Sequence, residues 1–369
     1  MKIIHCADLH LDSKMTSNLD SVRAKERKGE LLNTFVRMVE YGESKNVDAI
    51  LLAGDMFDTG SITALTRNTV RDAIEAHPDI DFYYLKGNHD RDSFLSSLET
   101  VPDNLKLFSD SWKSYPMNDD GSVVITALEL NRDNNGICYS ALVLDPSVIN
   151  IVMLHGQESE TKTRDKAEII ALRELKNKNI DYLALGHVHS YKEEALDARG
   201  VYCYPGCLEG RGFDETGEHG FVMLDIDPKE HKILREFVPF ASRRLYEVKV
   251  DVTGTVDTAG MLQRVEKRIE QEDIDTRSLV KIVLNGAVDI EAEKDPDYIR
   301  LRFEDSFYFV KISDETEYKV DYADYAYDAS LKGEYVRMIE ASTDISDSDK
   351  PEVIRMGLKA IAGEDIVLL

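Results

Sequence analysis

Five short, mostly apolar segments of this chain are each followed at once by a polar cluster rich in Asp, His and Gly. The segments are Lys2–Cys6, Asp48–Ala53, Phe82–Leu85, Ile149–Leu154 and Tyr182–Leu185. Helical spacing of apolar residues recurs between them, over Val22–Lys45, Ile62–Ala76 and Asp165–Asn177. Because buried strands that alternate with helices form parallel sheets covered by helices, this recurrence predicts a layered α/β sandwich.

Further segments extend the predicted sheets and then give way to a different pattern. Additional strands are predicted over Val123–Leu130, Tyr139–Leu144, Val201–Tyr204 and Phe221–Ile226. After residue 240 the sequence predicts a helix over Thr258–Glu270 and strands over Arg244–Val252, Ser278–Leu284, Ile299–Phe303 and Ser306–Ile312. We therefore expect a large domain over residues 1–240, a smaller α+β domain over 241–330, and a helical segment over 331–369 that includes an amphipathic helix at Pro351–Ile361.

The overall composition is that of a folded, strongly acidic protein. Of the 369 residues, 70 are acidic and 45 are basic, so the formal charge is −25. This bulk charge repels phosphates and argues against nucleic-acid binding over a broad surface. The four cysteines form no CxxC pair, and no signal peptide or membrane-spanning stretch is evident, so we expect a cytoplasmic protein with reduced thiols.

The polar clusters carry the chemistry. They are Asp8-Leu9-His10, Gly54-Asp55-Met56-Phe57-Asp58, Gly87-Asn88-His89-Asp90, His155-Gly156 and Gly186-His187-Val188-His189. Because each cluster follows a predicted strand, all five are expected at one edge of the sheets. Asp8 and His10 are two positions apart, as are His187 and His189, so we expect each pair to point to one side of its strand.

These residue types suit divalent metals. Carboxylate, imidazole and amide groups together favour Mn²⁺, Fe²⁺ or Zn²⁺, and a shared carboxylate would allow two ions to lie side by side. A single Asp-x-His pair or a single histidine is usually structural. Five clusters in order, which hold five of the nine histidines, favour a metal site over coincidence.

In this order the clusters resemble the signature of calcineurin-like metallophosphoesterases, over roughly residues 1–240. The resemblance implies a four-layer α/β/β/α sandwich and assigns roles by position. It implies that the first metal is held by Asp8, His10, Asp55 and His189. It implies that the second is held by a bridging Asp55 with Asn88, His155 and His187. His89 would be the catalytic histidine, oriented by Asp58.

A narrower resemblance concerns the subfamily. Residues 4–12 and the stretch 204–215 resemble SbcD-type DNA repair exonucleases, and the region after residue 240 resembles their capping domain. Residues 330–337 resemble the YhaO-like branch of that group. Cys207 stands where this group often has Ser, a departure that involves no expected metal ligand.

The resemblance implies a two-metal DNA nuclease, a hydrolase of phosphodiesters in DNA repair and recombination. Mn²⁺ is the expected metal, with Fe²⁺, Zn²⁺ or Mg²⁺ as alternatives. The implied partners are DNA, an SbcC-like coiled-coil ATPase and a second copy of the chain, with no membrane. Two other functions remain open at this point: a phosphoesterase acting on nucleotides or other small phosphoesters, and a scaffold subunit without catalysis.

Two basic groups are candidates for DNA contact. Arg23, Lys25, Arg27 and Lys28 are expected on the solvated start of a helix rather than against DNA. Arg243 and Arg244 lie at the expected domain boundary, and the sequence favours neither phosphate contact nor a structural role for them.

Overall fold

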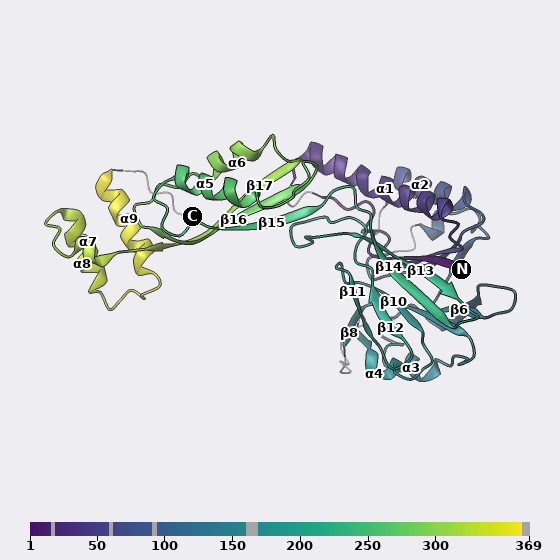
Figure 1. The fold of residues 1–369 in the computed structure, drawn as a ribbon. Helices are drawn as coiled ribbons and strands as arrows, with labels where there is room; N and C mark the ends of the chain where they lie inside the picture. Colours follow the sequence, from purple (N-terminus) through teal and green to yellow (C-terminus); the bar gives the residue numbers. More distant parts are fainter. Residues whose placement is uncertain (16–18, 59–61, 91–93, 160–168, 364–369) are drawn as a thin grey trace. The chain divides into compact units, whose positions relative to one another are not determined.

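The computed structural model describes residues 1–369 apart from 16–18, 59–61, 91–93, 160–168 and 364–369 (Figure 1). The chain divides into two compact units, Met1–Arg244 and Leu245–Leu369. The division between the units lies close to the boundary expected at residue 240, and the C-terminal helices are grouped with the second unit.

One sheet of the first unit has the strand order β14-β13-β1-β2-β3-β4. Its strands are β1 (Lys2–Cys6), β2 (Ala49–Ala53), β3 (Asp81–Leu85), β4 (Leu105–Leu107), β13 (Gly220–Asp227) and β14 (Lys232–Pro239). Strands β1 to β4 are parallel, and the β13–β14 hairpin pairs antiparallel with β1. The carboxyl ends of β1, β2 and β3 therefore lie at one edge of this sheet.

The other sheet has the order β11-β12-β10-β7-β6-β5. Its strands are β5 (Lys113–Pro116), β6 (Val123–Ala127), β7 (Ile149–His155), β10 (Tyr182–Gly186), β11 (Lys192–Ala195) and β12 (Val201–Tyr204). The four central strands are parallel, and the edge strands β5 and β11 are antiparallel to their neighbours. A separate pair, β8 (Gln157–Ser159) and β9 (Ile169–Ala171), follows β7 in the chain.

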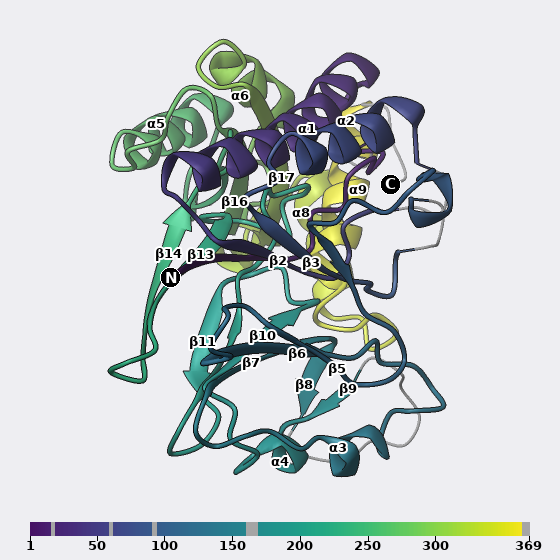
Figure 2. The ribbon, with the colours of Figure 1, turned by 90° about the vertical axis from the view of Figure 1, so that its right-hand side faces the viewer.

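The two sheets and four helices form the expected α/β/β/α layers (Figure 2). Neighbouring residues of β1 show the alternation: Ile3 packs between the sheets, and Ile4 packs beneath the helices of the first layer. Those helices are α1 (Ser21–Ser44) and α2 (Ala64–Glu75), and α3 (Cys138–Ala141) and α4 (Leu172–Leu175) cover the other sheet. A short 3₁₀ turn spans Leu95–Ser97.

Three predicted elements were wrong. The segment predicted as strand Tyr139–Leu144 begins within helix α3. In the helix predicted over Asp165–Asn177, residues 165–168 lie outside the described residues, Ile169–Ala171 is strand β9, and only Leu172–Leu175 is helical. Ile299–Phe303 ends helix α6 because the chain supplies a helix start: Asp295 accepts a hydrogen bond from the Tyr298 N–H, and Pro296 follows it.

The second unit is built around a three-stranded sheet, β15 (Leu245–Asp251), β16 (Leu279–Asp289) and β17 (Phe309–Lys319). All three strands are parallel, so strands and helices alternate here rather than segregate. Helices α5 (Thr258–Ile269) and α6 (Pro296–Phe303) pack on this sheet through a core that includes Val265 and Ile299. Helices α7 (Tyr322–Tyr325), α8 (Leu331–Glu340) and α9 (Lys350–Ala362) follow (Figure 1). Val336 and Ile354 pack in a second small core.

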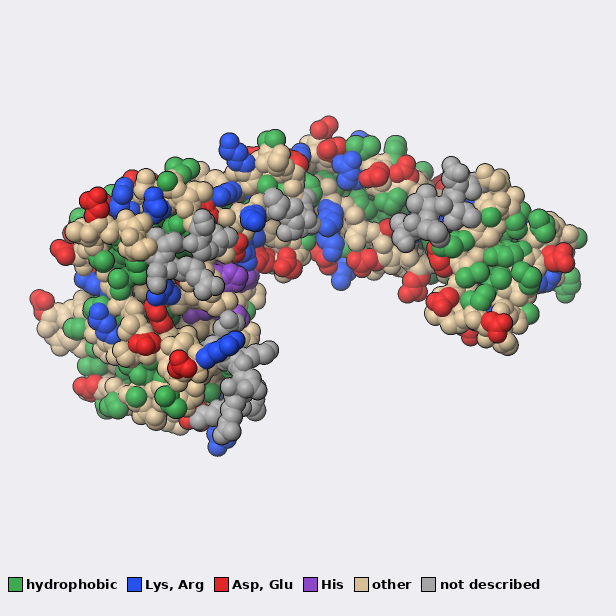
Figure 3. Space-filling view, turned by 180° about the vertical axis from the view of Figure 1, so that it is seen from behind, with side chains coloured by type: hydrophobic (Ala, Val, Ile, Leu, Met, Phe, Trp, Pro, Cys, Tyr) green, Lys and Arg blue, Asp and Glu red, His purple; other side chains and the backbone are tan. Residues whose placement is uncertain are grey.

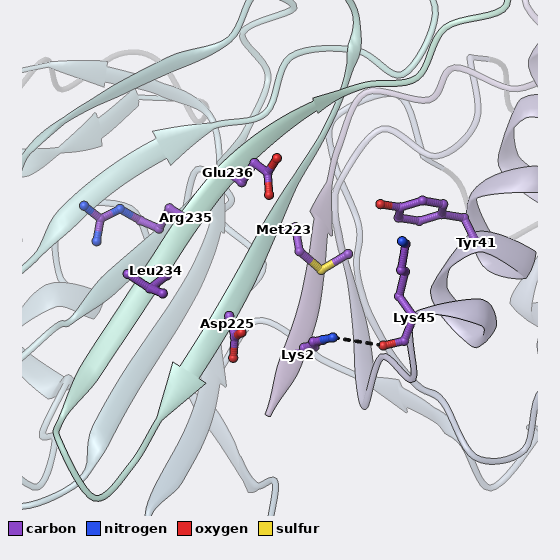
Figure 4. Close-up of a pocket in the computed structure, with 8 residues that line it drawn as sticks. All are labelled: Lys2, Tyr41, Lys45, Met223, Asp225, Leu234, Arg235 and Glu236. Carbon is purple, nitrogen blue, oxygen red and sulfur yellow. Dashed lines mark hydrogen bonds between the residues drawn. The ribbon is translucent and has the colours of Figure 1, made fainter.

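A pocket of about 410 Å³ lies between the end of α1 and the β13–β14 hairpin (Figure 4). Lys2, Tyr41, Lys45 and Met223 contribute to its lining, and the Lys2 ammonium donates to the carbonyl of Lys45. None of the predicted site residues lines this pocket. Over the described part of the chain, helices fall short of the length and hydrophobicity needed to cross a membrane.

Candidate metal centre

The carboxyl ends of the two sheets meet at the predicted site. The His155 imidazole at the end of β7 lies with Nδ1 2.9 Å from the Ala53 carbonyl, at the end of β2. The His187 N–H, just after β10, lies 2.9 and 3.0 Å from the two carboxylate oxygens of Asp8, which follows β1. These contacts bring together clusters that are far apart in the sequence.

The first group of candidate ligands is Asp8, His10 and His189, whose ligand atoms all lie within 4.8 Å of one another. The Nε2 atoms of His10 and His189 face each other at 3.2 Å. Asp8 and His10 are each only 1% exposed. Two imidazole nitrogens aimed at one point beside a buried carboxylate are the donor set that a divalent transition metal prefers.

The second group is Asp8, Asp55 and His155, which also lie within 4.8 Å of one another. Asn88 joins it, with Oδ1 3.0 Å from His155 Nε2, and the His187 ring centroid is 5.5 Å from that of His155. One Asp55 oxygen, Oδ2, lies 3.4 Å from His155 Nε2 and 4.0 Å from His10 Nε2. The position of Asp55 between the groups fits the bridging role, and the residues fit two ions; each ligand assignment stays a prediction.

The charges of this centre are strongly coupled. Burial alone would raise the pKa of Asp55, but its hydrogen bond and charge interaction with His155 outweigh burial and lower the pKa to about 2. Burial opposes the charge on His155, yet Asp55 raises its pKa to about 9. Burial raises the pKa of Asp8 to about 6. His155 and Asp55 thus form an ion pair whose proton a bound cation would displace, because a ligating imidazole must be neutral.

The backbone of the site is unusually bent. Asp8, His10, Asp55 and His187 have φ values of +53°, +44°, +51° and +108°, in a region that residues other than glycine rarely adopt. Asp8 and His10, like His187 and His189, were expected to point to one side because side chains alternate along a strand, and this explanation is wrong. Their side chains converge because the chain turns sharply after each strand.

Glycine is required at one of these turns. Gly54 has φ +93°, and a Cβ atom there would lie 2.1 Å from His155 Nδ1. Any side chain would therefore push the His155 imidazole out of the centre, which explains why the cluster Gly54-Asp55 begins with glycine.

The predicted catalytic pair lies at the edge of the centre. The His89 side chain is 45% exposed, and its backbone N–H donates to Asp55 Oδ1 at 2.8 Å. The carboxylate of Asp58 is 3.9 Å from His89 Nδ1 but only 3.3 Å from His10 Nδ1. Asp58 therefore contacts His10 more closely than His89. The orientation of His89 by Asp58 therefore stays a prediction. Within the described part of the chain, His89 Nδ1 has one hydrogen-bonding neighbour within 3.5 Å, the backbone carbonyl of Asp58.

Sequence reasoning assigned no role to three residues at the site. Glu215 Oε1 lies 2.6 Å from His189 Nδ1, and Arg211 donates to both Glu215 and Asp58. Asp90 accepts hydrogen bonds from the N–H groups of Gly87, Met56 and Phe57, which ties the second and third clusters together. Arg211 and Glu215 belong to the stretch 204–215, whose resemblance to SbcD-type enzymes was the only indication in the sequence that these residues lie near the site.

Three of the candidate DNA-contacting arginines pair with carboxylates of this chain. Arg27 is buried and pairs with Glu209 at 3.0 Å and with Glu30, so its expected place on a solvated helix start was wrong. Arg243 pairs with Glu30 at 2.7 Å, and Arg244 pairs with Glu218 at 3.2 Å. The His89 side chain is exposed, so the centre is open to solvent on this side. Histidine side chains are also visible at the surface of the first unit in Figure 3.

Sequence comparison finds similar proteins among the metallophosphoesterases and the DNA repair proteins. The uncharacterized metallophosphoesterase YhaO of Bacillus subtilis is 27% identical over 278 residues, which cover 72% of this chain and 67% of that protein. The DNA double-strand break repair protein Mre11 of Aeropyrum pernix is 24% identical over 270 residues, 68% of this chain and 64% of that protein. The chain thus matches about two thirds of the length of these relatives.

A solved structure, TT1561 of Thermus thermophilus, aligns with 64% of this chain and 98% of its own, at 15% identity and a TM-score of 0.42. The family model for calcineurin-like phosphoesterases matches residues 1–191, more than half of the chain. This match includes every predicted metal ligand. The chain belongs to the calcineurin-like phosphoesterase family.

Proposed function

We propose that this phosphoesterase is a two-metal nuclease that hydrolyses phosphodiester bonds of DNA, in the manner of SbcD-type enzymes. The observation that carries the proposal is the convergence of the candidate ligands around Asp55, with His89 exposed beside them. The similarity to proteins named for DNA double-strand break repair supports DNA over other phosphodiesters.

The metals proposed for this centre are two Mn²⁺ ions. Asp8, His10 and His189 would hold one ion, Asn88, His155 and His187 the other, and Asp55 both. Mixed nitrogen and oxygen donors suit Mn²⁺ as well as Fe²⁺ or Zn²⁺. When bound, two such ions supply an activated water and neutralise charge on the phosphoryl oxygens.

The residues of the chain contribute positioning and proton transfer. The buried carboxylate of Asp55 is fixed by the His89 N–H, so the loop that carries His89 is tied to the centre. The exposed His89 imidazole can approach a bound phosphodiester, and in the proposed reaction it donates a proton to the leaving oxygen. Burial of Asp8 and His10 keeps water from competing for those ligands.

A partner is part of this proposal. The chain carries −25 overall, and Arg27 and Arg243 are paired with the carboxylates of Glu209 and Glu30. An SbcC-like coiled-coil ATPase, together with a second copy of this chain, would supply the remaining DNA-binding surface.

Digestion of end-labelled single-stranded and linear duplex DNA, with and without Mn²⁺, tests the proposal. We expect Mn²⁺-dependent degradation that the H89A variant lacks, by the chain alone or with the ATPase. Hydrolysis of p-nitrophenyl phosphate without cleavage of either DNA would instead favour a phosphoesterase for small substrates.

A further inference from the structure

The loop that follows β12 carries two charged residues to the outer side of the first group of ligands. Glu215 is 7% exposed at its side chain, and its Oε1 atom lies 2.6 Å from His189 Nδ1. This carboxylate pairs with the Nδ1 side of His189, so that Nε2 is directed toward His10. A carboxylate behind an imidazole in this way fixes both its tautomer and its orientation.

His10 also has a carboxylate near its outer nitrogen, although in the described part of the chain His10 Nδ1 makes no hydrogen bond. The Asp58 carboxylate lies 3.3 Å from His10 Nδ1, and the Nε2 atom of His10 faces His189 Nε2 at 3.2 Å. Both imidazoles of the first group therefore have a carboxylate behind them and a shared point in front of them.

Arg211 joins these two carboxylates. Its Nη1 atom donates to Asp58 Oδ1 at 3.2 Å, and its Nη2 atom donates to Glu215 Oε1 at 2.9 Å. Its backbone N–H also donates to Glu215 Oε2 at 2.7 Å, so the loop and the side chain hold the same carboxylate. A planar guanidinium can bridge two carboxylates in this way, whereas a single ammonium presents no such fork.

We propose that Arg211 is a positioning residue for the first metal. By holding Asp58 and Glu215 together, it keeps the imidazoles of His10 and His189 aimed at one point. It also offsets the repulsion of two carboxylates that lie beside the candidate ligands.

A direct contact between Arg211 and the substrate phosphate is the competing role. The geometry disfavours it, because both Nη atoms already donate to carboxylates. The remaining guanidinium nitrogen, Nε, is buried and has no hydrogen-bond partner in the described part of the chain. The Arg211 side chain as a whole is 19% exposed, far less than His89.

Calorimetric titration of the full chain with Mn²⁺, without DNA, tests this inference in the R211Q variant. We expect one of two Mn²⁺ sites to weaken by about ten- to a hundredfold, with the other site unchanged. The matched control is R235Q, because Arg235 pairs with Glu193 at 3.1 Å on the edge strands and outside the site. That control should bind both ions as the parental chain does.

Parental affinity at both sites in R211Q would overturn the inference, and a raised KM for bis(p-nitrophenyl) phosphate alongside it would assign Arg211 to substrate contact. Where R211Q fails to fold by circular dichroism, R211K decides, because its ammonium lacks the fork that bridges the two carboxylates: loss at one site supports the inference, and parental affinity at both sites contradicts it. The inference rests on the metal centre of the proposed function but not on DNA as substrate. Because Mn²⁺ binding is measured directly and without DNA, the titration still tests the role of Arg211 if the chain proves not to be a nuclease.

Discussion

At the scale of single residues, Asp55 and His89 illustrate two different ways of serving one centre. Asp55 is buried and lies between the two groups of candidate ligands. His89 is tied to Asp55 through its backbone N–H, and its imidazole remains accessible. The position of Asp55 suits metal binding, and the position of His89 suits contact with a substrate.

The His89→Ala variant separates these roles. We expect it to retain both metals but to lose at least about a hundredfold in kcat on a phosphodiester, the usual contribution of a proton donor. Elemental analysis and steady-state kinetics measure the two quantities. His231→Ala, at an exposed histidine that pairs with Asp181, is the control and should behave as the parental chain. Parental turnover in H89A would refute the assigned role.

At the residue scale the sequence located the clusters but not the contacts among them. Asp8, Asp55, Asn88 and His155 could be predicted because each follows or ends an apolar strand, and parallel strands bring their carboxyl ends together. The contact of Glu215 with His189 spans 26 positions and depends on how one loop folds back, which no periodicity records.

At the scale of elements, helix α1 is fixed to the first unit by a buried ion pair. The side chains of Arg27 and Glu209 are each 1% exposed and lie 3.0 Å apart. Thr34, further along the same helix, donates its hydroxyl to Glu209 as well. The loop that leads to Arg211 is therefore anchored to α1 just before it reaches the site.

Replacement of Arg27 by Met would leave Glu209 buried without its charge partner. We expect the free energy of unfolding to fall by about 3–5 kcal/mol, as measured by urea denaturation. The matched control is Arg23→Met on the same helix, where the pair with Asp20 is exposed and contributes little to stability. An equal loss of unfolding free energy in the two variants would show that burial of the Arg27–Glu209 pair does not increase its contribution to stability.

The neighbouring Glu30 makes this anchor sensitive to acid. Burial would raise the pKa of Glu30, but its hydrogen bonds with Arg243 and Arg27 outweigh burial and lower that pKa below its ordinary value. A carboxyl whose pKa is lowered by folding contributes stability above its unfolded pKa and loses it as the pH falls through the folded pKa.

We therefore expect the parental chain to lose more unfolding free energy than Glu30→Gln between about pH 5 and about pH 3. Denaturant titrations at the two pH values measure this difference. Glu43→Gln, on the exposed side of α1 beside His77, serves as the control. An identical pH dependence in the parental and E30Q chains would contradict the proposed linkage.

The elements that the sequence predicted well are those whose apolar face meets a core. Helix α1 is of this kind because its buried residues recur at helical spacing, and strand β2 because it is a continuous apolar run that is buried throughout. The edge strand β14 and the helix α6 were not predicted. Strand β14 has no fully buried residue, and α6 depends on the cap at Asp295. Strand β14 forms because it pairs with β13, and helix α6 forms because Asp295 caps it. Neither feature follows from hydrophobic periodicity.

At the scale of the whole molecule, the charge of −25 sets the expected behaviour toward DNA. A site that holds two cations can attract a phosphodiester locally, while the remaining surface repels the duplex. We expect the isolated chain to bind DNA with a Kd weaker than about 1 μM at physiological salt, and to bind more weakly still as salt rises. Fluorescence anisotropy measures this, and tight, salt-resistant binding would contradict it.

The central claim, that Asp55 lies between two metal sites, is tested most directly by anomalous X-ray diffraction from crystals grown with Mn²⁺. We predict two anomalous peaks: one at Asp8, His10 and His189, the other at Asn88, His155 and His187. The Asp55 carboxylate should contact both. A single peak, or two peaks that do not share Asp55, would contradict the account.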